Sequence, residues 1–566
     1  MLCSFEMIAS LFKTLIRADP LINHKFFFLL FLMILAAAFE VLGLAVVIPA
    51  ILSFISNRPL AFFDDIALTI TPLQFLISIF ILYIVKTTYL LLYNFLHLKL
   101  VFDTEANLTT YLYKKVIHTT TVAMDSSKLA TNLVRSPSNI SFNIWNSFLT
   151  IVSEFLIVVF ISIYLFVKFR LETLILICTI GICALVIILS FKSKISNWSR
   201  LRLLQENESI GMAKESLQAH IDIQQSQSHD YFKHKFNAIV RTGSTAATFY
   251  HFINNSPRIV LEFIIIFSLL FFLGVSLYSD LKLDASIEFL STIALASMRL
   301  LPSFNKIIVA SNSIRVGQPY LGHYNASLNQ CDLKEALELP SSEIDIHVNS
   351  LEITNMDVLN AKHEVILRGV NFNIQSKGIY GITGPSGIGK STFGRQLIGY
   401  GNSSSGVVAI NGDAITMLNR RNIFKYISQQ TTLIRDTVIN NIAFGLQTTG
   451  HSQIQLDHAI HMSKVGFTGL TYDEVLSKDV HENGNNLSGG ERQRILFARI
   501  IMLNPKILII DEATSAIDRD IQQDILTDLR SWLEGRIVLW ITHDRELISM
   551  FDGEIDLSQF ANIKKV

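Results

Sequence analysis

Residues 378–392 read GIYGITGPSGIGKST, and this stretch decides the fold of the second half of the chain. A short apolar strand leads into a glycine-rich loop, and a helical pattern follows the loop. Glycines let backbone N–H groups turn inward around a phosphate group, and the start of the helix adds positive potential. The stretch therefore predicts a phosphate-binding loop made of Gly384, Pro385, Ser386, Gly387, Ile388, Gly389, Lys390, Ser391 and Thr392.

Two side chains of this loop have the chemistry of nucleotide binding. We expect Lys390 to contact the β- and γ-phosphates of a nucleotide and Ser391 to ligate Mg²⁺. The cofactors that the loop predicts are therefore ATP and Mg²⁺. The order of strand, loop and helix is the context that separates such a loop from a chance match.

A second apolar strand, 506–511, ends in the paired carboxylates Asp511 and Glu512. Charges at the end of an apolar strand are costly unless they have partners. We expect Asp511 to hold Mg²⁺, directly or through water, and Glu512 to polarise the attacking water. Alone, the pair could lie in a solvated loop; beside a phosphate-binding loop, a catalytic role explains it better.

Residues 486–494 read NLSGGERQR and resemble the signature motif of ABC transporters. Two glycines open a helix here, so the same phosphate-binding physics applies, and a serine adds a hydroxyl. In ABC proteins this helix start contacts the nucleotide held by a partner domain. The resemblance implies that two such domains enclose two ATP molecules head to tail, each contributing Leu487, Ser488, Gly489, Gly490 and Glu491.

Three further positions match the same family. Gln429 resembles the Q-loop glutamine, which is implied to sense Mg²⁺ and the attacking water. Asp518 resembles the D-loop aspartate, and His543 the switch histidine that contacts the γ-phosphate. The resemblance implies that the catalytic residues are Glu512, His543 and Gln429, and that the metal ligands are Ser391, Gln429 and Asp511.

Two positions depart from the family pattern. Glu491 replaces the more common glutamine of the signature motif, a change that we expect to be mild. Asn360 stands near the place of the aromatic residue that stacks on adenine, upstream of the phosphate-binding loop. The residue that contacts adenine is therefore left open.

The composition indicates a membrane protein. The chain has 566 residues, too many for one core, and is 50% hydrophobic and only 17% charged, whereas soluble domains carry about 25% charged residues. Its mean hydropathy is +0.40. Lys+Arg and Asp+Glu balance at 47 each, so no nucleic-acid partner is expected. The four cysteines form no close pair and predict neither a disulfide framework nor a zinc site.

The first half of the chain repeats apolar stretches long enough to cross a bilayer, which needs about 20 helical residues. We therefore predict a six-helix transmembrane domain over 1–312, a polar linker over 313–339 and an α/β ATPase domain over 340–566. The segment 5–18 is amphipathic and suits an interfacial or a short cytoplasmic helix. The six expected spans are 26–55, 70–96, 146–168, 171–191, 257–279 and 286–312.

Basic residues predict the orientation. The long connections 97–145 and 192–256 carry most of the lysines and arginines between spans, and the positive-inside rule places them in the cytoplasm together with both termini. We expect a multi-pass protein of the cytoplasmic membrane with its ATPase domain in the cytoplasm. The first apolar run begins well inside the chain and is too long for a cleavable leader, so none is expected.

The first half also resembles the flippases of lipid-linked oligosaccharides, through short matches around Glu40, Glu154, 257–262 and 299–303. In such flippases basic residues are implied to engage a pyrophosphate head group, and Arg299 is the residue that matches. Arg299 could equally lie against a carboxylate of a neighbouring helix.

The sequence thus predicts an α-helical six-helix transmembrane domain followed by an α/β P-loop ABC ATPase domain. We expect an ATP-driven exporter or flippase, acting as a homodimer on an amphipathic, most simply lipid-linked, substrate. A heterodimer stays open, as does export of a peptide, a lipid or a hydrophobic drug. From another class, the chain could be an ATP-gated channel or regulator. The six apolar spans exclude a soluble ABC ATPase acting on DNA or ribosomes.

Overall fold

The computed structural model shows two compact units, which we describe separately. The first unit contains Met1–Ile117 and Ser126–Gln330, and the second contains Cys331–Val566. The structure describes residues 2–56, 72–118, 126–278, 283–332, 347–360, 363–400, 405–428, 432–446, 451–466, 471–512, 527, 530 and 532–561.

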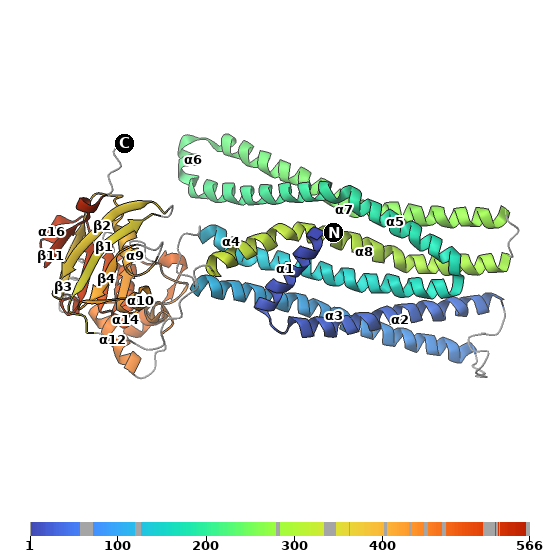
Figure 1. Cartoon of the computed structure of the whole chain (residues 1–566), viewed down its shortest axis with the longest axis horizontal. Helices are drawn as coiled ribbons and strands as arrows, with labels where there is room; N and C mark the ends of the chain where they lie inside the picture. The colour runs from blue at the N-terminus through green and yellow to red at the C-terminus, as the bar shows by residue number, and fades with distance from the viewer. Residues whose placement is uncertain are drawn as a thin grey trace. The chain divides into compact units, whose positions relative to one another are not determined.

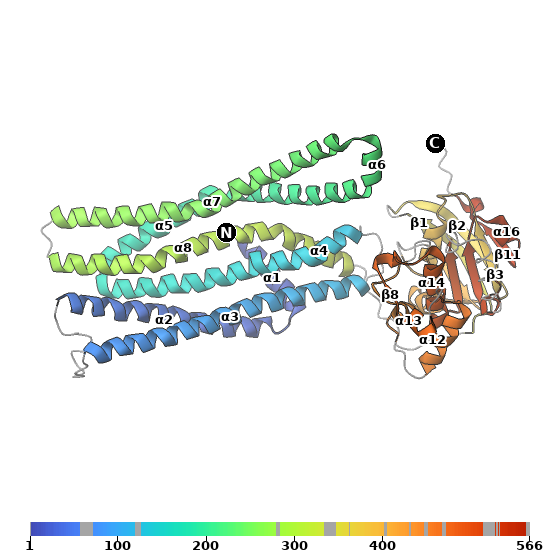
Figure 2. The same cartoon turned by 180° about the vertical axis from the view of Figure 1, so that it is seen from behind.

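The first unit is built from long helices that run side by side (Figure 1). The ribbon of α5 reverses its direction part-way along, as both views show (Figures 1 and 2), so that one helix makes two passes. The elements are α1 (Leu2–Ala18), α2 (Ile22–Ser56), α3 (Pro72–His118), α4 (Ser126–Asn139), the π-helix η1 (Ile140–Asn146), α5 (Ser147–Gln218), α6 (His220–Ser226), α7 (His229–Tyr278) and α8 (Leu283–Asp332).

Three helical segments among the described residues are long and apolar enough to cross a membrane: Ile22–Gly43, Ile77–Ile117 and Asn132–Val167. They overlap the first three predicted spans. The other three predicted ranges lie within α5, α7 and α8, where many side chains are outside the described part. α8 has 50 residues and is therefore about 75 Å long, more than twice a hydrocarbon core of about 30 Å.

The segment 313–339, expected to be a linker, begins as helix. α8 continues to Asp332 because apolar residues recur on one face of this polar stretch at helical spacing. Leu321, Tyr324 and Leu328 are buried there, and the Tyr324 hydroxyl donates to the Leu108 carbonyl oxygen at 2.9 Å. The segment is polar because one side of this helix is exposed. The domain boundaries themselves stay a prediction.

α1 is the amphipathic helix predicted over 5–18, and it packs with its apolar face on the other helices of the unit. Phe12 makes edge-to-face contacts with Trp145 and Phe148, with ring centroids 5.6 and 5.7 Å apart. The Thr14 hydroxyl lies 3.0 Å from Oδ1 of Asn325 on α8. These contacts tie α1 to the π-helix, α5 and α8.

The second unit contains a five-stranded parallel sheet in the order β11-β3-β10-β9-β6. Both central strands, β9 (Ile507–Asp511) and β10 (Ile537–Ile541), are buried along their whole length. A parallel sheet that is covered on both faces needs such continuous apolar strands, and runs of this kind can be recognised in a sequence. The other strands are β3 (Gly378–Thr383), β6 (Phe424–Ile427) and β11 (Gly553–Asp556).

A second, antiparallel sheet has the order β2-β1-β4-β5. Its strand β1 begins at Leu351, and residues 347–350 before it are not in a strand. The remaining elements are β1 (Leu351–Leu359), β2 (Val365–Ile374), α9 (Lys390–Leu397), β4 (Val407–Ile410), β5 (Asp413–Ala414), α10 (Met417–Ile423), β7 (Asp436–Thr437), α11 (Val438–Ala443), α12 (His451–Met462), α13 (Tyr472–Ser477), β8 (Asp479–Val480), η2 (Glu482–Gly484), α14 (Gly489–Leu503), α16 (Arg545–Ile548) and η3 (Leu557–Phe560).

The strand register brings the predicted functional segments to one edge of the parallel sheet. Ile541 at the end of β10 pairs with Asp511 on β9 and with Ile382 on β3. The loop after β3, the carboxylates after β9 and the histidine after β10 therefore emerge side by side. In open α/β sheets this carboxyl edge is where ligands bind.

Candidate nucleotide-binding site

The loop between β3 and α9 has the backbone of a phosphate cradle. Gly384, Gly387 and Gly389 have φ angles of 141°, 80° and 109°, a region that favours glycine. At Gly389 a Cβ atom would come within 2.5 Å of Cδ1 of Ile366, so a larger residue there would also have to displace that side chain. The loop can therefore turn its N–H groups inward, as its sequence predicts.

Lys390 lies at the centre of this loop and is 6% exposed. Its Nζ donates to the carbonyl oxygens of Gly384 and Pro385 at 2.9 and 3.2 Å. Burial lowers the pKa of Lys390, and the nearby carboxylates Glu512 and Asp511 oppose that shift. The desolvated ammonium gains most from a neighbouring phosphate, which is the role expected of it.

A chain of contacts joins the loop to the other two strand ends. His543 Nε2 lies 2.9 Å from Lys390 Nζ and 3.3 Å from Oε1 of Glu512. Glu512 itself has a φ of 46°, and its N–H donates to the Ile541 carbonyl oxygen at 3.0 Å. Left-handed backbone at a non-glycine residue is uncommon and concentrates at functional sites. Three residues predicted from separate motifs thus meet in one place.

Asp511 ends β9 and is 3% exposed. The Tyr426 hydroxyl, from the neighbouring strand β6, donates to its Oδ2. Burial raises the pKa of Tyr426, and the hydrogen bond to Asp511 raises it further, so the phenol stays a donor. Sequence reasoning missed Tyr426, because a cross-strand hydrogen bond depends on register.

These residues fit the predicted Mg²⁺ ion by their chemistry. A carboxylate buried at the end of an apolar strand needs a cation or donors around it. Asp511 supplies carboxylate oxygens, and Ser391, the second residue of α9, supplies a hydroxyl. Mg²⁺ prefers such oxygen ligands, completed by phosphate oxygens and water. The loop backbone and Lys390 complement the phosphates themselves.

The signature residues form a second potential phosphate contact at the start of α14. Ser488 caps this helix: its Oγ accepts from the Glu491 N–H at 3.2 Å, and its N–H donates to the Glu491 carboxylate at 2.6 Å. Leu487 is buried behind the cap, whereas a Cβ on Gly490 would have open space. Among the described residues, the side-chain hydrogen bonds of Ser488 and Glu491 are with each other and none reaches the phosphate-binding loop.

Two of the predicted site residues stay predictions, because the structure does not describe them. Gln429 and Asp518 lie outside the described residues. Asn360, near the expected adenine contact, closes the turn between β1 and β2: its side chain bonds both the N–H and the carboxylate of Glu364 at 2.9 Å. The residue that contacts adenine therefore stays open.

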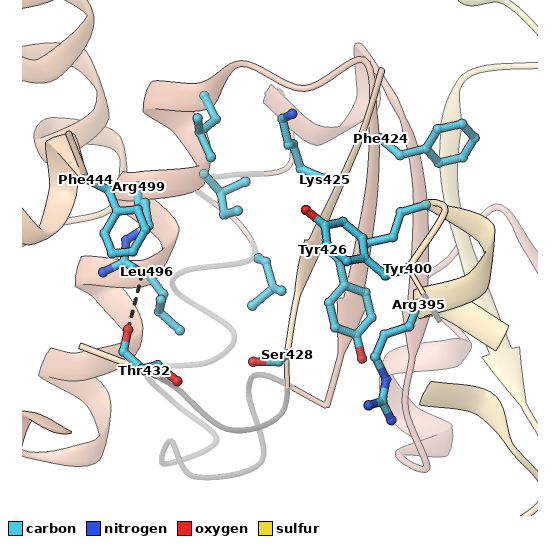
Figure 3. A pocket seen from close by; sticks show the side chains of 14 residues that line it. Arg395, Tyr400, Phe424, Lys425, Tyr426, Ser428, Thr432, Phe444, Leu496 and Arg499 are labelled. Atoms are coloured by element: carbon cyan, nitrogen blue, oxygen red, sulfur yellow. Dashed lines mark hydrogen bonds between the residues drawn. The ribbon is translucent and has the colours of Figure 1, made fainter. Parts of the chain in front are cut away.

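A cavity of about 500 Å³ is lined in part by Tyr426, the residue that donates to Asp511 (Figure 3). On one wall Arg499 lies 4.0 Å from the Phe444 ring centroid and donates to the Thr432 carbonyl oxygen at 3.3 Å. Tyr426 and Arg395 form the opposite wall in the same view. Burial lowers the pKa of Arg499 to about 10, which leaves it charged at neutral pH.

Comparisons with known proteins agree with this geometry. Residues 367–515 match the family described as ABC transporter. The chain is 33% identical over 218 residues to an ATP-binding cassette sub-family B member 6 of Rattus norvegicus, which covers 37% of this chain and 26% of that protein. An ATP-dependent lipid A-core flippase of Syntrophus aciditrophicus is 32% identical over 215 residues, 38% of this chain and 34% of that protein.

A longer match is to a multidrug resistance ABC transporter ATP-binding and permease protein of Lactococcus lactis. It is 27% identical over 456 residues, or 77% of this chain and 74% of that protein. Other relatives are matched over only 26% to 38% of their own length.

The fold of the whole chain has a solved counterpart. The structure of a bacterial Atm1-family ABC exporter with ATP bound superposes with a TM-score of 0.77, at 18% identity, over 96% of this chain and 94% of that one. The match covers the helical unit as well as the unit with the phosphate-binding loop. Residues 367–515 therefore belong to an ABC transporter domain, and the whole chain has the fold of an ABC exporter, in which a helical domain precedes the ABC ATPase domain.

Proposed function

We propose that this chain is one half of an ATP-driven exporter that hydrolyses ATP at the edge of the parallel sheet. The observation that carries the proposal is the convergence of Lys390, His543 and Glu512, which come from three different strand ends. A protein that only bound nucleotide would not need a carboxylate beside this histidine. An ATP-gated channel or regulator is therefore the weaker alternative.

The site residues divide the work of hydrolysis. The loop amides and Lys390 bind the β- and γ-phosphates, and Lys390 exchanges its contact with His543 for phosphate oxygens. Glu512 orients and polarises the attacking water, while His543 donates to the γ-phosphate. Ser391 and Asp511 would hold Mg²⁺, which neutralises the charge that develops on the phosphates.

A second copy of the chain completes each site in this proposal. Ser488 supplies a hydroxyl at the start of α14, and a Cβ on Gly490 would meet nothing within 4 Å; among the described residues, the hydrogen bonds of the Ser488 side chain do not reach the phosphate-binding loop. The start of a helix of 15 residues is a favourable place for a phosphate. Because one chain carries all of these motifs, a homodimer is the simplest assembly, and a heterodimer is the alternative.

The helical unit contains a charged cluster that bears on the cargo, with its two carboxylates nearly buried. Glu40 on α2 pairs with Lys86 on α3 at 2.9 Å and with Arg299 on α8 at 3.1 Å. One turn further along α8, Glu154 on α5 accepts from Ser303 and pairs with Lys306, both at 2.6 Å. Arg299 thus has the helix carboxylate that the sequence left open as an alternative.

Among the described residues, this cluster has three basic side chains and two carboxylates, so one cation is in excess. Nε of Arg299 is buried and has no hydrogen-bond partner among the described residues. Ionisable groups within apolar helices are costly and usually serve a function. We infer that the cargo is amphipathic with an anionic head group, as in a lipid-linked oligosaccharide, moved across the cytoplasmic membrane.

The name of the Syntrophus relative, a lipid A-core flippase, supports this choice of cargo. The name of the Lactococcus relative supports a second one, a hydrophobic drug, and that protein matches over more of the chain. The charged cluster favours the first, because a neutral drug gains nothing from an excess cation. A peptide or another lipid remains an alternative within the same mechanism.

ATPase activity of the purified protein in lipid nanodiscs tests the proposal, measured with and without a lipid-linked oligosaccharide. We expect hydrolysis by the wild type, a change in its rate with the glycolipid, and loss of hydrolysis in Glu512→Gln. Hydrolysis that responds to a drug and ignores the glycolipid would contradict the cargo but keep the exporter. ATP binding without hydrolysis would favour the channel or regulator.

A further inference from the structure

The carboxylate of Asp511 accepts a hydrogen bond from Tyr426, which lies outside the motifs that the sequence analysis identified. Asp511 is almost fully buried, and among the described residues the side chain that donates to it is Tyr426. The Tyr426 hydroxyl donates to Oδ2 of Asp511, so it does not occupy Oδ1. A hydrogen bond at one oxygen restricts rotation of the carboxylate and so favours one direction for the lone pairs of the other oxygen.

The fold places Tyr426 for this contact. β6 runs parallel to β9, with Tyr426 opposite Ile509, two residues before Asp511. Side chains two residues apart point to the same face of a sheet, so the long phenol reaches forward along the strand to the carboxylate. On its other side, a Cβ added to Gly394 of α9 would come within 3.1 Å of the Tyr426 ring. The ring is therefore confined between α9 and the end of β9.

We propose that Tyr426 is a positioning residue for Mg²⁺: its hydroxyl fixes the Asp511 carboxylate so that the free oxygen faces the metal and the phosphate-binding loop. This inference rests on the proposed ATPase function. Partners that orient a metal-binding carboxylate are worth about 10- to 100-fold in metal affinity or activity. Tyr426 lines the cavity as well (Figure 3), so its ring connects the cavity wall to the metal site.

The test replaces Tyr426→Phe, which removes the hydroxyl and keeps the ring. Mn²⁺ binding to the protein with a non-hydrolysable ATP analogue is followed by electron paramagnetic resonance, and the Mg²⁺ dependence of hydrolysis is measured in parallel. We expect Mn²⁺ affinity to fall by about 10-fold or more and half-maximal activity to need more Mg²⁺. Binding of a fluorescent ATP analogue in excess EDTA should not change, because that readout contains no metal.

Tyr380→Phe is the matched control. Its hydroxyl is on β3 of the same sheet but bonds to Ser376 at 2.9 Å, away from Asp511. Unchanged Mn²⁺ affinity in Tyr426→Phe would overturn the inference. An equal loss of metal-free nucleotide binding would do the same, because it would show a general structural role. If the wild type itself neither binds the metal–nucleotide complex nor hydrolyses it, the proposed function fails instead.

Discussion

At the scale of single residues, the site is organised around Lys390. Lys390 is shared between two loop carbonyls and His543, so binding of phosphate has to compete with these contacts. The same histidine contacts Glu512, which couples the binding residue to the residue expected to polarise water. His543 therefore has two separable effects, one on binding and one on hydrolysis.

Replacing His543→Ala should separate these effects. The loss of one hydrogen bond to a charged group costs about 1.5–3 kcal/mol, so hydrolysis should fall about 10- to 150-fold. Nucleotide affinity should fall less than hydrolysis, because the release of Lys390 from the histidine offsets part of the lost contact to the γ-phosphate. Steady-state ATPase assays and titration with a fluorescent ATP analogue give the two numbers. An affinity loss as large as that of Lys390→Ala would contradict this assignment.

At the scale of elements, the cap of α14 combines two roles in one residue. The Glu491 carboxylate accepts the Ser488 N–H, and its charge lies at the positive end of the helix. The same charge lies where a phosphate of the second copy is proposed to bind. The family's more common glutamine keeps the acceptor oxygen without the charge.

Glu491→Gln should therefore lower the stability of the protein and raise its affinity for nucleotide. Losing the favourable charge at the helix start costs about 0.3–1 kcal/mol of stability. Removing a like charge beside the phosphate should change the binding free energy by a similar amount. The ATP concentration for half-maximal hydrolysis should therefore fall about two- to fivefold. Thermal unfolding and ATPase titration measure the two effects. A higher ATP requirement in Glu491→Gln would refute the argument; Glu491→Ala, which loses the acceptor too, should lower stability further.

The contact between α8 and the π-helix η1 is another feature that one residue makes possible. At Gly317 on α8, an added Cβ would lie 2.4 Å from Cγ1 of Ile144 and 3.1 Å from Cβ of Asn143. Gly317→Ala should therefore lower the free energy of unfolding by about 1–3 kcal/mol, the usual cost of overpacking. Thermal unfolding in nanodiscs measures it, and adding Ile144→Ala should restore part of the loss.

Gly322 on the same helix provides the control for Gly317. It is exposed, and a Cβ there would meet nothing within 4 Å. Gly322→Ala should leave stability unchanged or raise it by about 0.5–1 kcal/mol, because alanine restricts the unfolded chain more than glycine. Equal effects of the two substitutions would mean that the close approach of α8 to η1 does not matter.

The elements that the sequence predicted well share a physical cause. β3, β9 and β10 are short apolar runs because they lie inside a parallel sheet, and the loop after β3 has glycines that its φ angles require. Tyr426 was not predictable, since its bond to Asp511 depends on the register of two strands far apart in sequence. The pairing of Arg299 with Glu40 likewise depends on how α8 packs against α2.

At the scale of the whole molecule, the two units differ in how much of their function can be predicted from the sequence. The family match covers 367–515, within the second unit, where local motifs specify chemistry at a single sheet edge. The helical unit has the exporter fold, but its charged cluster is assembled from α2, α3, α5 and α8 and has no local signature. This difference explains why nucleotide chemistry is readable from sequence while cargo is not.

The proposed dimer makes a prediction that only the whole assembly can satisfy. If each site combines the loop of one chain with the signature residues of another, Lys390→Ala and Ser488→Ala chains should complement each other. A mixed dimer then holds one site with both halves intact, whereas each homodimer holds two damaged sites. In a Glu512→Gln background, mixed dimers isolated through two different affinity tags should retain ATP after washing, and neither homodimer should. Retention no better than that of the homodimers would show that the site is completed within one chain, or by a different partner, and would remove the reason for two copies.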